Sequence, residues 1–222
     1  MFVIMLAVYN VFLSKISRQK DIVVGVPTAG RHHPGLDDII GMFVNTLALR
    51  NYPGDEKTFA DFLKQVRQRT LEAFTNQDYQ FEDLVNQVVK QRDTSRNPIF
   101  DVFFSFRAPG ITQELPVSLT DDEESPLKPD EETKTFGAEN TLSMFDLYFQ
   151  GAEIKEEIFL VLVYSTKLFK KETMEKFINY MIEIILSVTG NNQVKLKDIK
   201  ISHDLGSAAP TIFQDEEGDF GF

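Results

Sequence analysis

The order of its apolar segments is the feature that most constrains how this chain of 222 residues can fold. β-Branched and aromatic runs indicate strands, and apolar residues that recur every three or four positions indicate helices. These patterns predict helices at 2–17, from Thr58 onward, at about 81–89 and at 171–188, and strands at 21–27, 42–52, 99–106, 144–150 and 157–165, with VKLKDIKI (194–201) as an added edge strand. This order predicts an α/β two-layer sandwich, with helices packed on one face of a mixed sheet.

Two of the helices carry a clear apolar stripe. The residues expected to be buried are Phe81, Leu84, Val85, Val88 and Val89 in one helix and Met174, Phe177, Ile178, Met181, Ile182, Ile185 and Leu186 in the last. The first segment, MFVIMLAVYNVFL, is too short to span a bilayer, is interrupted by Asn10, and lacks the basic region and cleavage site of a signal peptide. We expect a buried amphipathic helix there, whose uncapped start belongs to a piece of a longer protein, and no membrane association.

Cysteine is absent from the chain. This excludes disulfides, thiolate nucleophiles and Cys-ligated zinc, and it favours a reducing, cytoplasmic location. The net charge of −11 argues against nucleic acid as a partner, because phosphates need clustered Lys and Arg. Residues 121–132 and 213–222 carry −6 and −4 of that charge. We therefore expect an acidic mobile insert at about 116–135 and an acidic linker or disordered tail at 204–222.

Three stretches carry a more specific signal, namely IGMFVNTLALR (40–50), NQDYQFEDL (76–84) and RDTSRNPIF (92–100). In order and in spacing they resemble three motifs of the condensation domains of nonribosomal peptide synthetases. The segment that leads to Arg31, FDL at 145–147 and YSTKLF at 164–169 resemble the flanking parts of the same family. The resemblance covers about residues 1–203.

Domains of this family pair two subdomains, each similar to chloramphenicol acetyltransferase, in a V around a tunnel. Phosphopantetheine arms of two carrier proteins enter from opposite faces, and an aminoacyl amine attacks an acyl thioester. The catalytic motif HHxxxDG belongs to the N-terminal subdomain, whereas this chain resembles the C-terminal one. The resemblance implies a half domain, inactive alone, whose partners are the N-terminal subdomain, peptidyl carrier proteins and an adenylation domain after the tail. It implies no covalently bound cofactor, and an isolated half would expose an apolar face and self-associate.

RHHPGLDD (31–38) imitates the catalytic motif by letter. His32 and His33 stand at the right distance from an Asp, but Asp38 replaces the Gly of the motif, and the stretch lies in a connection predicted to be a loop. The pair is also a poor metal site, because adjacent His side chains diverge and no third ligand lies at helical spacing. We interpret it as a decoy, with no catalytic residue in this chain. In the resembled family this connection crosses toward the partner subdomain, which would place the histidines near the other half without a chemical role.

Three polar residues are candidates to line the tunnel or to bind a pantetheine arm, namely Asn45, Thr46 and Ser105. For Asn45 and Thr46 the alternative, that they satisfy neighbouring backbone groups, is equally open. Ser105 lies in an apolar strand that could face the tunnel, and no Gly-x-Ser-x-Gly elbow marks it as a nucleophile.

The other motif residues are expected to be structural, namely Gly41, Phe43, Arg50, Gln77, Asp78, Glu82, Arg92, Asp93, Arg96 and Asn97. Around 76–84 the acidic and amide side chains are expected to cap a helix start. The run RDTSRNP is expected to form a turn locked by ion pairs, and Phe43, Val44 and Leu47 are expected in the core.

The leading hypothesis is the C-terminal half of an amide-forming condensation domain, which contributes tunnel and acceptor-side surface. A non-catalytic fragment that binds carrier proteins or acts as a scaffold is the first alternative. Half of an epimerisation domain is the second, although RDTSRNP and NQDYQFE resemble condensation domains more closely. An independent acyltransferase that uses His33 is the third.

Overall fold

The computed structural model describes residues 1–31, 33–36, 38–91, 96–107, 143–154 and 157–202. His32, Arg92, Asp93, the acidic insert and the tail from 204 lie outside the described residues, so what the sequence predicts for them stays a prediction. The described helices are α1 (Phe2–Ser17), α2 (Phe59–Thr75), α3 (Phe81–Val88) and α4 (Lys171–Gly190), with short 3-10 turns η1 (Pro34–Leu36) and η2 (Leu196–Asp198). The described strands are β1 (Ile22–Thr28), β2 (Asn45–Asn51), β3 (Val102–Arg107), β4 (Leu147–Ile154) and β5 (Glu157–Tyr164).

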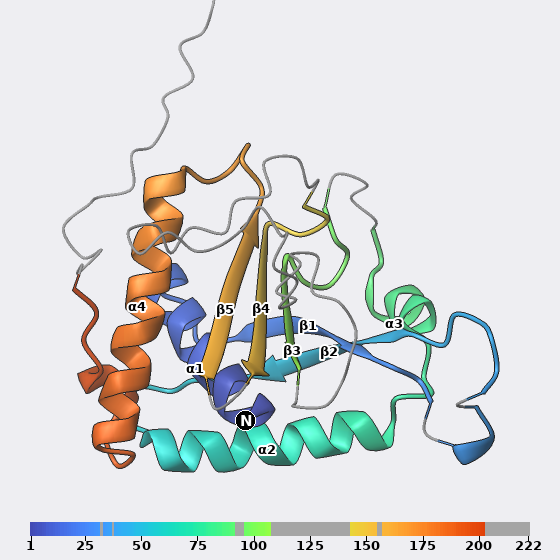
Figure 1. Ribbon diagram of the computed structural model, residues 1–222, viewed down its shortest axis with the longest axis horizontal. Helices are drawn as coiled ribbons and strands as arrows, with labels where there is room; N and C mark the ends of the chain where they lie inside the picture. The colour runs from blue at the N-terminus through green and yellow to red at the C-terminus, as the bar shows by residue number, and fades with distance from the viewer. Residues whose placement is uncertain (32, 37, 92–95, 108–142, 155–156, 203–222) are drawn as a thin grey trace, which may run out of the picture.

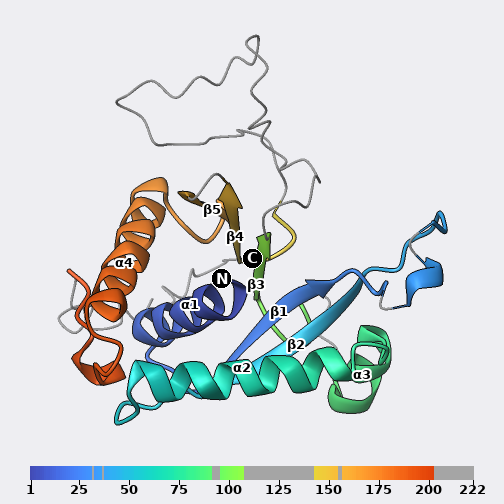
Figure 2. The same cartoon turned by 60° about the horizontal axis from the view of Figure 1, so that its bottom comes forward.

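These strands form one mixed sheet in the order β2-β1-β3-β4-β5. The pairs β1–β2 and β4–β5 are antiparallel, whereas β1–β3 and β3–β4 are parallel. Helices α1, α2 and α4 lie on one side of the sheet, with α1 between the other two, and α3 lies beyond the far end of α2 (Figures 1 and 2). The predicted two-layer α/β architecture is therefore confirmed. We call the side that contacts α1 the helix face and the opposite side the far face.

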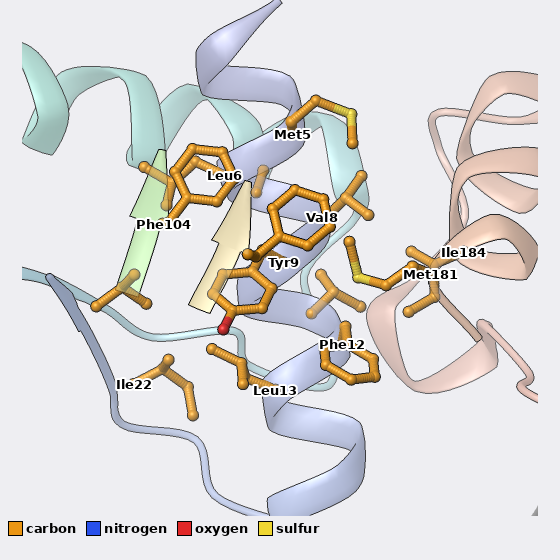
Figure 3. Packing of buried hydrophobic residues seen from close by; sticks show 14 of the residues in the cluster. Met5, Leu6, Val8, Tyr9, Phe12, Leu13, Ile22, Phe104, Met181 and Ile184 are labelled. Carbon is orange, nitrogen blue, oxygen red and sulfur yellow. The ribbon is translucent and has the colours of Figure 1, made fainter. Parts of the chain in front are cut away.

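The core is organised around α1, which is buried from Met5 to Ser14. Its Tyr9 ring packs against Phe104 of β3, with ring centroids 5.8 Å apart (Figure 3), and against Phe149 of β4 at 5.2 Å. Such a helix, apolar all round, is typical of a core element. The prediction of a buried helix is confirmed, but the helix is not amphipathic, because α2 and α4 cover the sides that the sheet leaves free. None of the described helices is long and apolar enough to cross a membrane.

The sheet has a narrow seam between β1 and β3. One residue pair, Gly25 and Phe103, registers these two strands, whereas six pairs register β3 with β4. Gly25 is needed at this point, since a Cβ there would lie 2.2 Å from the Phe100 ring, which packs over it on the far face. The pair β1–β2 therefore joins the three strands β3, β4 and β5 along a short contact sealed by aromatic side chains.

Several element boundaries differ from the sequence prediction. β2 begins at Asn45 rather than at 42, because its last partner, Thr28, is where β1 ends, and Val44 is consequently 62% exposed instead of buried. The predicted strand at 99–106 begins at Val102, since Phe100 folds over Gly25.

The predicted apolar stripes are only partly buried. In α3 only Val85 is fully buried, and Val88 is 62% exposed. In α4 the buried stripe runs through Met174, Phe177, Tyr180, Met181, Ile184 and Val188. Ile182 and Leu186, at 43% and 66% exposure, lie on the flank of that stripe. Helical spacing alone did not separate the centre of the apolar face from its border.

The predicted edge strand at 194–201 is wrong. Its residues form the turn η2 and dock on the start of α2, where the backbone N–H groups of Phe59 and Ala60 donate to the carbonyl oxygens of Val194 and Asn192, both at 2.9 Å. These bonds satisfy donors that a helix start leaves free. We call residues 192–198 the strap. Lys195 and Lys197 bind Glu56 at 2.9 Å and 2.7 Å, and Leu196 is 3% exposed.

Candidate functional site

Residues of two motifs meet where β2 begins, next to the start of α3. Asn45 is 7% exposed there. Its Nδ2 donates to the carbonyl oxygens of Gln77 at 2.8 Å and Tyr79 at 2.9 Å, and its Oδ1 accepts the backbone N–H groups of Thr46 at 2.8 Å and Phe81 at 3.2 Å. These bonds use the whole hydrogen-bonding capacity of a side-chain amide. Asn45 therefore fixes the β2 motif to the α3 motif.

The start of α3 is capped from a distant part of the chain. The N-cap residue Gln80 makes no side-chain cap bond, and the N–H of Phe81 is bound by Asn45. Gln77, expected to cap this helix, instead accepts a hydrogen bond from Thr28 at 2.5 Å between Oε1 and Oγ1. Glu82 lies in the first turn, where a carboxylate favours the helix dipole. Asp78 is exposed in the turn before the helix.

Asn45 thus has no free amide group for a pantetheine arm in this arrangement. This geometry supports the alternative in which it satisfies neighbouring backbone groups, and contact of Asn45 with a pantetheine arm stays a prediction. Thr46 points the other way along the strand, toward the far face, and is half-buried. The role of Thr28 and the distant partners of Asn45 could not be predicted from local pattern, because the bonded residues lie 49 and 36 positions apart.

Ser105 lies on the far face of β3. Its Oγ is 3.0 Å from the hydroxyl of Tyr148 on β4, and both side chains are half-buried. Gln150 follows on the same face, because it pairs with Ser105 in the register of the two strands. Ser105 and Thr46 therefore share a face but stand on strands separated by β1. Sequence reasoning missed Tyr148, whose hydroxyl group ends a mostly apolar side chain on the same face.

Aromatic rings cover the end of the far face near the motifs. Phe103 stacks on Phe145 with centroids 4.4 Å apart, and Phe100 joins Phe81 of α3 at 5.4 Å. The Phe103 ring also meets Tyr148 edge-on at 5.2 Å. This cluster closes the seam and leaves the hydroxyl groups of Ser105 and Tyr148 at its border.

The RDTSRNP motif ends in a turn that its own side chains hold. Arg96 forms an ion pair with Asp101, and the Nδ2 of Asn97 donates to the carbonyl oxygen of Met144 at 3.1 Å. Burial raises the pKa of the neighbouring Asp146 carboxyl, and the charge of Asp101 adds to that effect. For the described part of this motif, the contacts are those of a structural turn.

The connection between β1 and β2 projects from one end of the sheet (Figures 1 and 2). Arg31 organises it: its guanidinium donates to the carbonyl oxygens of Leu36 and Gly41 and lies 4.4 Å from the centroid of the Phe43 ring. Phe43 is consequently half-buried under Arg31 and is not part of the core. Ile40 and Met42 point away from the protein, with exposures of 101% and 92%.

His33 stands in this projecting connection and is exposed. Its Nδ1 accepts the backbone N–H of Gly35 at 3.2 Å, which closes a local turn. In the described part of the chain, no group of three or more His, Asp or Glu side chains is arranged to hold a metal ion. His33 is therefore an exposed residue that accepts a backbone hydrogen bond, and it does not lie in the buried surroundings that tune a catalytic base.

Comparison with known proteins decides the family. The model of the condensation domain matches residues 1–209. The chain belongs to the condensation-domain family. It is 45% identical to tyrocidine synthase 3 of Brevibacillus parabrevis over 90% of its own length and 3% of that protein. It is 44% identical to surfactin synthase subunit 1 of Bacillus subtilis, again over 90% of this chain and 5% of that protein.

Solved structures of condensation domains share the fold. A four-domain nonribosomal peptide synthetase bound to AMP and glycine aligns with a TM-score of 0.75 at 22% identity, over 92% of this chain and 16% of that one. The X-domain from teicoplanin biosynthesis aligns with a TM-score of 0.72 at 20% identity, over 90% of this chain and 44% of that one. This condensation-domain chain therefore spans a small part of the curated synthetases and less than half of an isolated domain of the family.

Proposed function

We propose that this chain is the C-terminal half of a peptide-forming condensation domain, and that it acts together with an N-terminal half. The observation that carries the proposal is coverage: nearly all of the chain matches the family, yet it spans 41% of the first condensation domain of the calcium-dependent antibiotic synthetase. The motif contacts around Asn45, Gln77 and Arg96 hold strands, turns and a helix start in place. None of these contacts prepares a group for proton transfer.

In the reaction we propose, the amine of a carrier-bound aminoacyl group attacks the carbonyl carbon of a carrier-bound acyl thioester. The C–N bond forms, the C–S bond breaks, and the thiol leaves with the proton that the amine gives up. The N-terminal half would supply the histidine that handles this proton. The contribution of this chain is a wall of the tunnel, on which Ser105 and Tyr148 offer two hydroxyl groups to the amides of a pantetheine arm.

The test is reconstitution of the domain from its two halves. The chain is incubated with loaded donor and acceptor carrier proteins, alone and with an N-terminal half that contains HHxxxDG, and the dipeptidyl product is measured by mass spectrometry. We expect product only when both halves are present. Product formed by this chain alone, in a reaction that His33→Ala abolishes, would overturn the proposal.

A second candidate function is a binding module without chemistry, and one observation favours it. The X-domain from teicoplanin biosynthesis, which shares this fold with a TM-score of 0.72, was solved in complex with OxyB. A condensation-type fold can therefore serve to hold another protein. Titration of the chain with loaded carrier proteins, read by NMR, would show binding with no product from the reconstituted halves if this function is the correct one.

A further inference from the structure

The strand β5 forms one edge of the sheet. It pairs with β4 along its whole length, from Glu157 opposite Ile154 to Tyr164 opposite Leu147, and no other strand in the described part of the chain pairs with its outer side (Figure 1). An edge strand presents unpaired backbone N–H and C=O groups, which can template pairing with another chain.

This edge is apolar on both faces of the sheet. Its register places Ile158, Leu160 and Leu162 on the helix face and Phe159, Val161 and Val163 on the far face. All six are at least partly exposed, and Ile158 is 41% exposed. Natural edge strands are protected by Lys, Pro, bulges or covering segments. Residues 158–164 contain neither a charged residue nor a proline.

The opposite edge, β2, shows what protection looks like in the same sheet. Arg50 lies on it and is paired with Asp21 at 2.5 Å. The guanidinium of Arg69 donates to the backbone carbonyl of Arg50 at 2.9 Å, and Lys57 donates to the carbonyl of Tyr52 at 2.8 Å. Side chains of α2 and of the segment before it thus occupy acceptors along this edge. Since β2 is protected in this way and β5 has neither a charged residue nor a proline over residues 158–164, β5 is the edge suited to pairing with another strand.

We propose that β5 pairs with the β5 strand of a second copy of this chain, antiparallel and about a two-fold axis at Val161. In that register Val161 faces its own copy, Phe159 faces Val163 on the far face, and Leu160 faces Leu162 on the helix face. Each opposing pair is apolar, which is the arrangement that stabilises neighbouring strands. A two-fold axis suits an edge that is complementary to itself.

Charge favours this register over the one that is shifted by moving the two-fold axis from Val161 to Leu160. A shift of the axis to Leu160 would place Glu157 opposite Val163, on an apolar surface. With the axis at Val161, Glu157 stands opposite Ser165, and Lys167 of the other copy follows in the chain. The negative start of one strand then meets the positive end of the other. The net charge of −11 on each copy opposes association, so the dimer strengthens as salt screens that repulsion.

The absence of cysteine permits a direct test by cross-linking. Cβ atoms of directly opposed residues on antiparallel strands lie about 4.5–5.5 Å apart, close to the range that a disulfide bridges. Oxidation of Val161→Cys at low protein concentration is expected to give a covalent dimer. Ile40→Cys, at a fully exposed position of the projecting connection, is the matched control and is expected to remain monomeric. Equal cross-linking of both variants would overturn the proposal.

Sedimentation of the unmodified chain provides the second measurement. We expect a dimer whose dissociation constant falls with added salt and rises roughly a hundredfold in Val161→Lys, because like charges would then face each other. Ile40→Lys is expected to leave the dimer unchanged. Loss of the dimer in this variant would mean that the chain associates through the projecting connection instead. If Val161→Lys does not fold, hydrogen exchange of the β5 amides is measured in the unmodified chain instead. Their protection is then expected to rise with protein concentration. A monomer at all concentrations, or protection that appears only when the rest of a condensation domain is added, would refute self-pairing.

Discussion

On its helix face the sheet buries Phe104 and Phe149 completely, whereas on its far face Ser105 and Tyr148 stay half-buried and are bonded to each other. The helix face receives a whole helix, α1, whose side chains fill the space between sheet and helices (Figure 3). Among the described residues, the rings around Phe103 cover one end of the far face. The comparison teaches that the described apolar packing is concentrated on one side of the sheet, and that the hydroxyl groups lie on the other.

The largest effect is expected from Phe104, which is fully buried and stacks parallel to Phe149 at 5.5 Å. Phe104→Ala removes a ring from the centre of the helix face and should lower the free energy of unfolding by about 3–5 kcal/mol, measured by urea denaturation. Leu71→Ala, at a site on α2 that is 58% exposed, is the control and should change it by less than about 0.5 kcal/mol. Similar losses in both variants would contradict a core centred on α1.

Asn45 tests the joint between the two motifs at the border of the faces. Asn45→Ala leaves the N–H of Phe81 and the carbonyl oxygens of Gln77 and Tyr79 without this partner, and should lower the free energy of unfolding by about 2–3 kcal/mol. Hydrogen exchange should show faster exchange in α3 than in α1. Asn45→Asp keeps the acceptor and loses both donors, so its free energy of unfolding should lie between those of the unmodified protein and of Asn45→Ala. If α3 exchanges at the same rate in Asn45→Ala, the joint is not at this residue.

Tyr9 tests whether every polar group buried at the helix face has a hydrogen-bond partner. Its hydroxyl is buried, no described group bonds to it, and burial raises the pKa of the phenol. Because an unpaired buried polar group costs about 1–3 kcal/mol, Tyr9→Phe should leave the protein as stable as before or more stable by about 1 kcal/mol. A clear loss of stability in thermal unfolding would mean that the hydroxyl has a partner.

Ser105 should behave in the opposite way to Phe104. Ser105→Ala removes one hydroxyl from the half-buried far face, so the free energy of unfolding should change by about 0.5–1 kcal/mol or less. In reconstituted halves it should raise the KM for loaded carrier protein more than it lowers kcat. Tyr148→Phe is the matched variant, since it deletes the other member of the pair. Unchanged kinetics in both would remove these hydroxyl groups from the tunnel.

The smallest effect is expected at the strap, on the perimeter of the helix side. The ammonium groups of Lys197 and Lys195 lower the pKa of Glu56 to about 2, from 4.5. A lowered carboxyl pKa stabilises the folded state above about pH 4.5, and this contribution disappears as the pH falls toward 2. Glu56→Gln should therefore flatten the acid dependence of stability in that range and lower the stability at pH 7 by the same amount, which is small because the pair is exposed. An unchanged dependence of stability on acid pH would mean that the ion pairs of Glu56 with Lys195 and Lys197 do not stabilise the strap.

The sequence was sufficient for the architecture, because the strand and helix patterns are set by local periodicity and the mixed sheet follows from their order. The three motifs also led to the right family. Local pattern could not reveal which residues at the end of a predicted strand would pair with a neighbouring strand. Val44 and Met42 read as strand residues, yet β1 ends at Thr28 and leaves them unpaired.

The candidate site was harder to predict than the fold for a related reason. The bonds of Asn45 and Thr28 join residues far apart in the chain, so their roles depend on how β2 and α3 meet. The strap shows the same limit, since VKLKDIKI has the alternation of a strand but donates and accepts its bonds at the start of α2. Leu196 and Ile199, three positions apart in this segment, reach into the core at 3% and 2% exposure.

The seam between β1 and β3 has a mechanical consequence. With a single registered pair at Gly25 and Phe103, the hairpin β1–β2 is joined to the other three strands by the least backbone bonding in the sheet. Shear between the two parts is resisted chiefly by rings, which slide at lower cost than a ladder of hydrogen bonds stretches. The sheet is therefore most compliant along that line, and a change of angle between its two parts would shift the Asn45 junction relative to Ser105 and Tyr148 while leaving each hairpin intact.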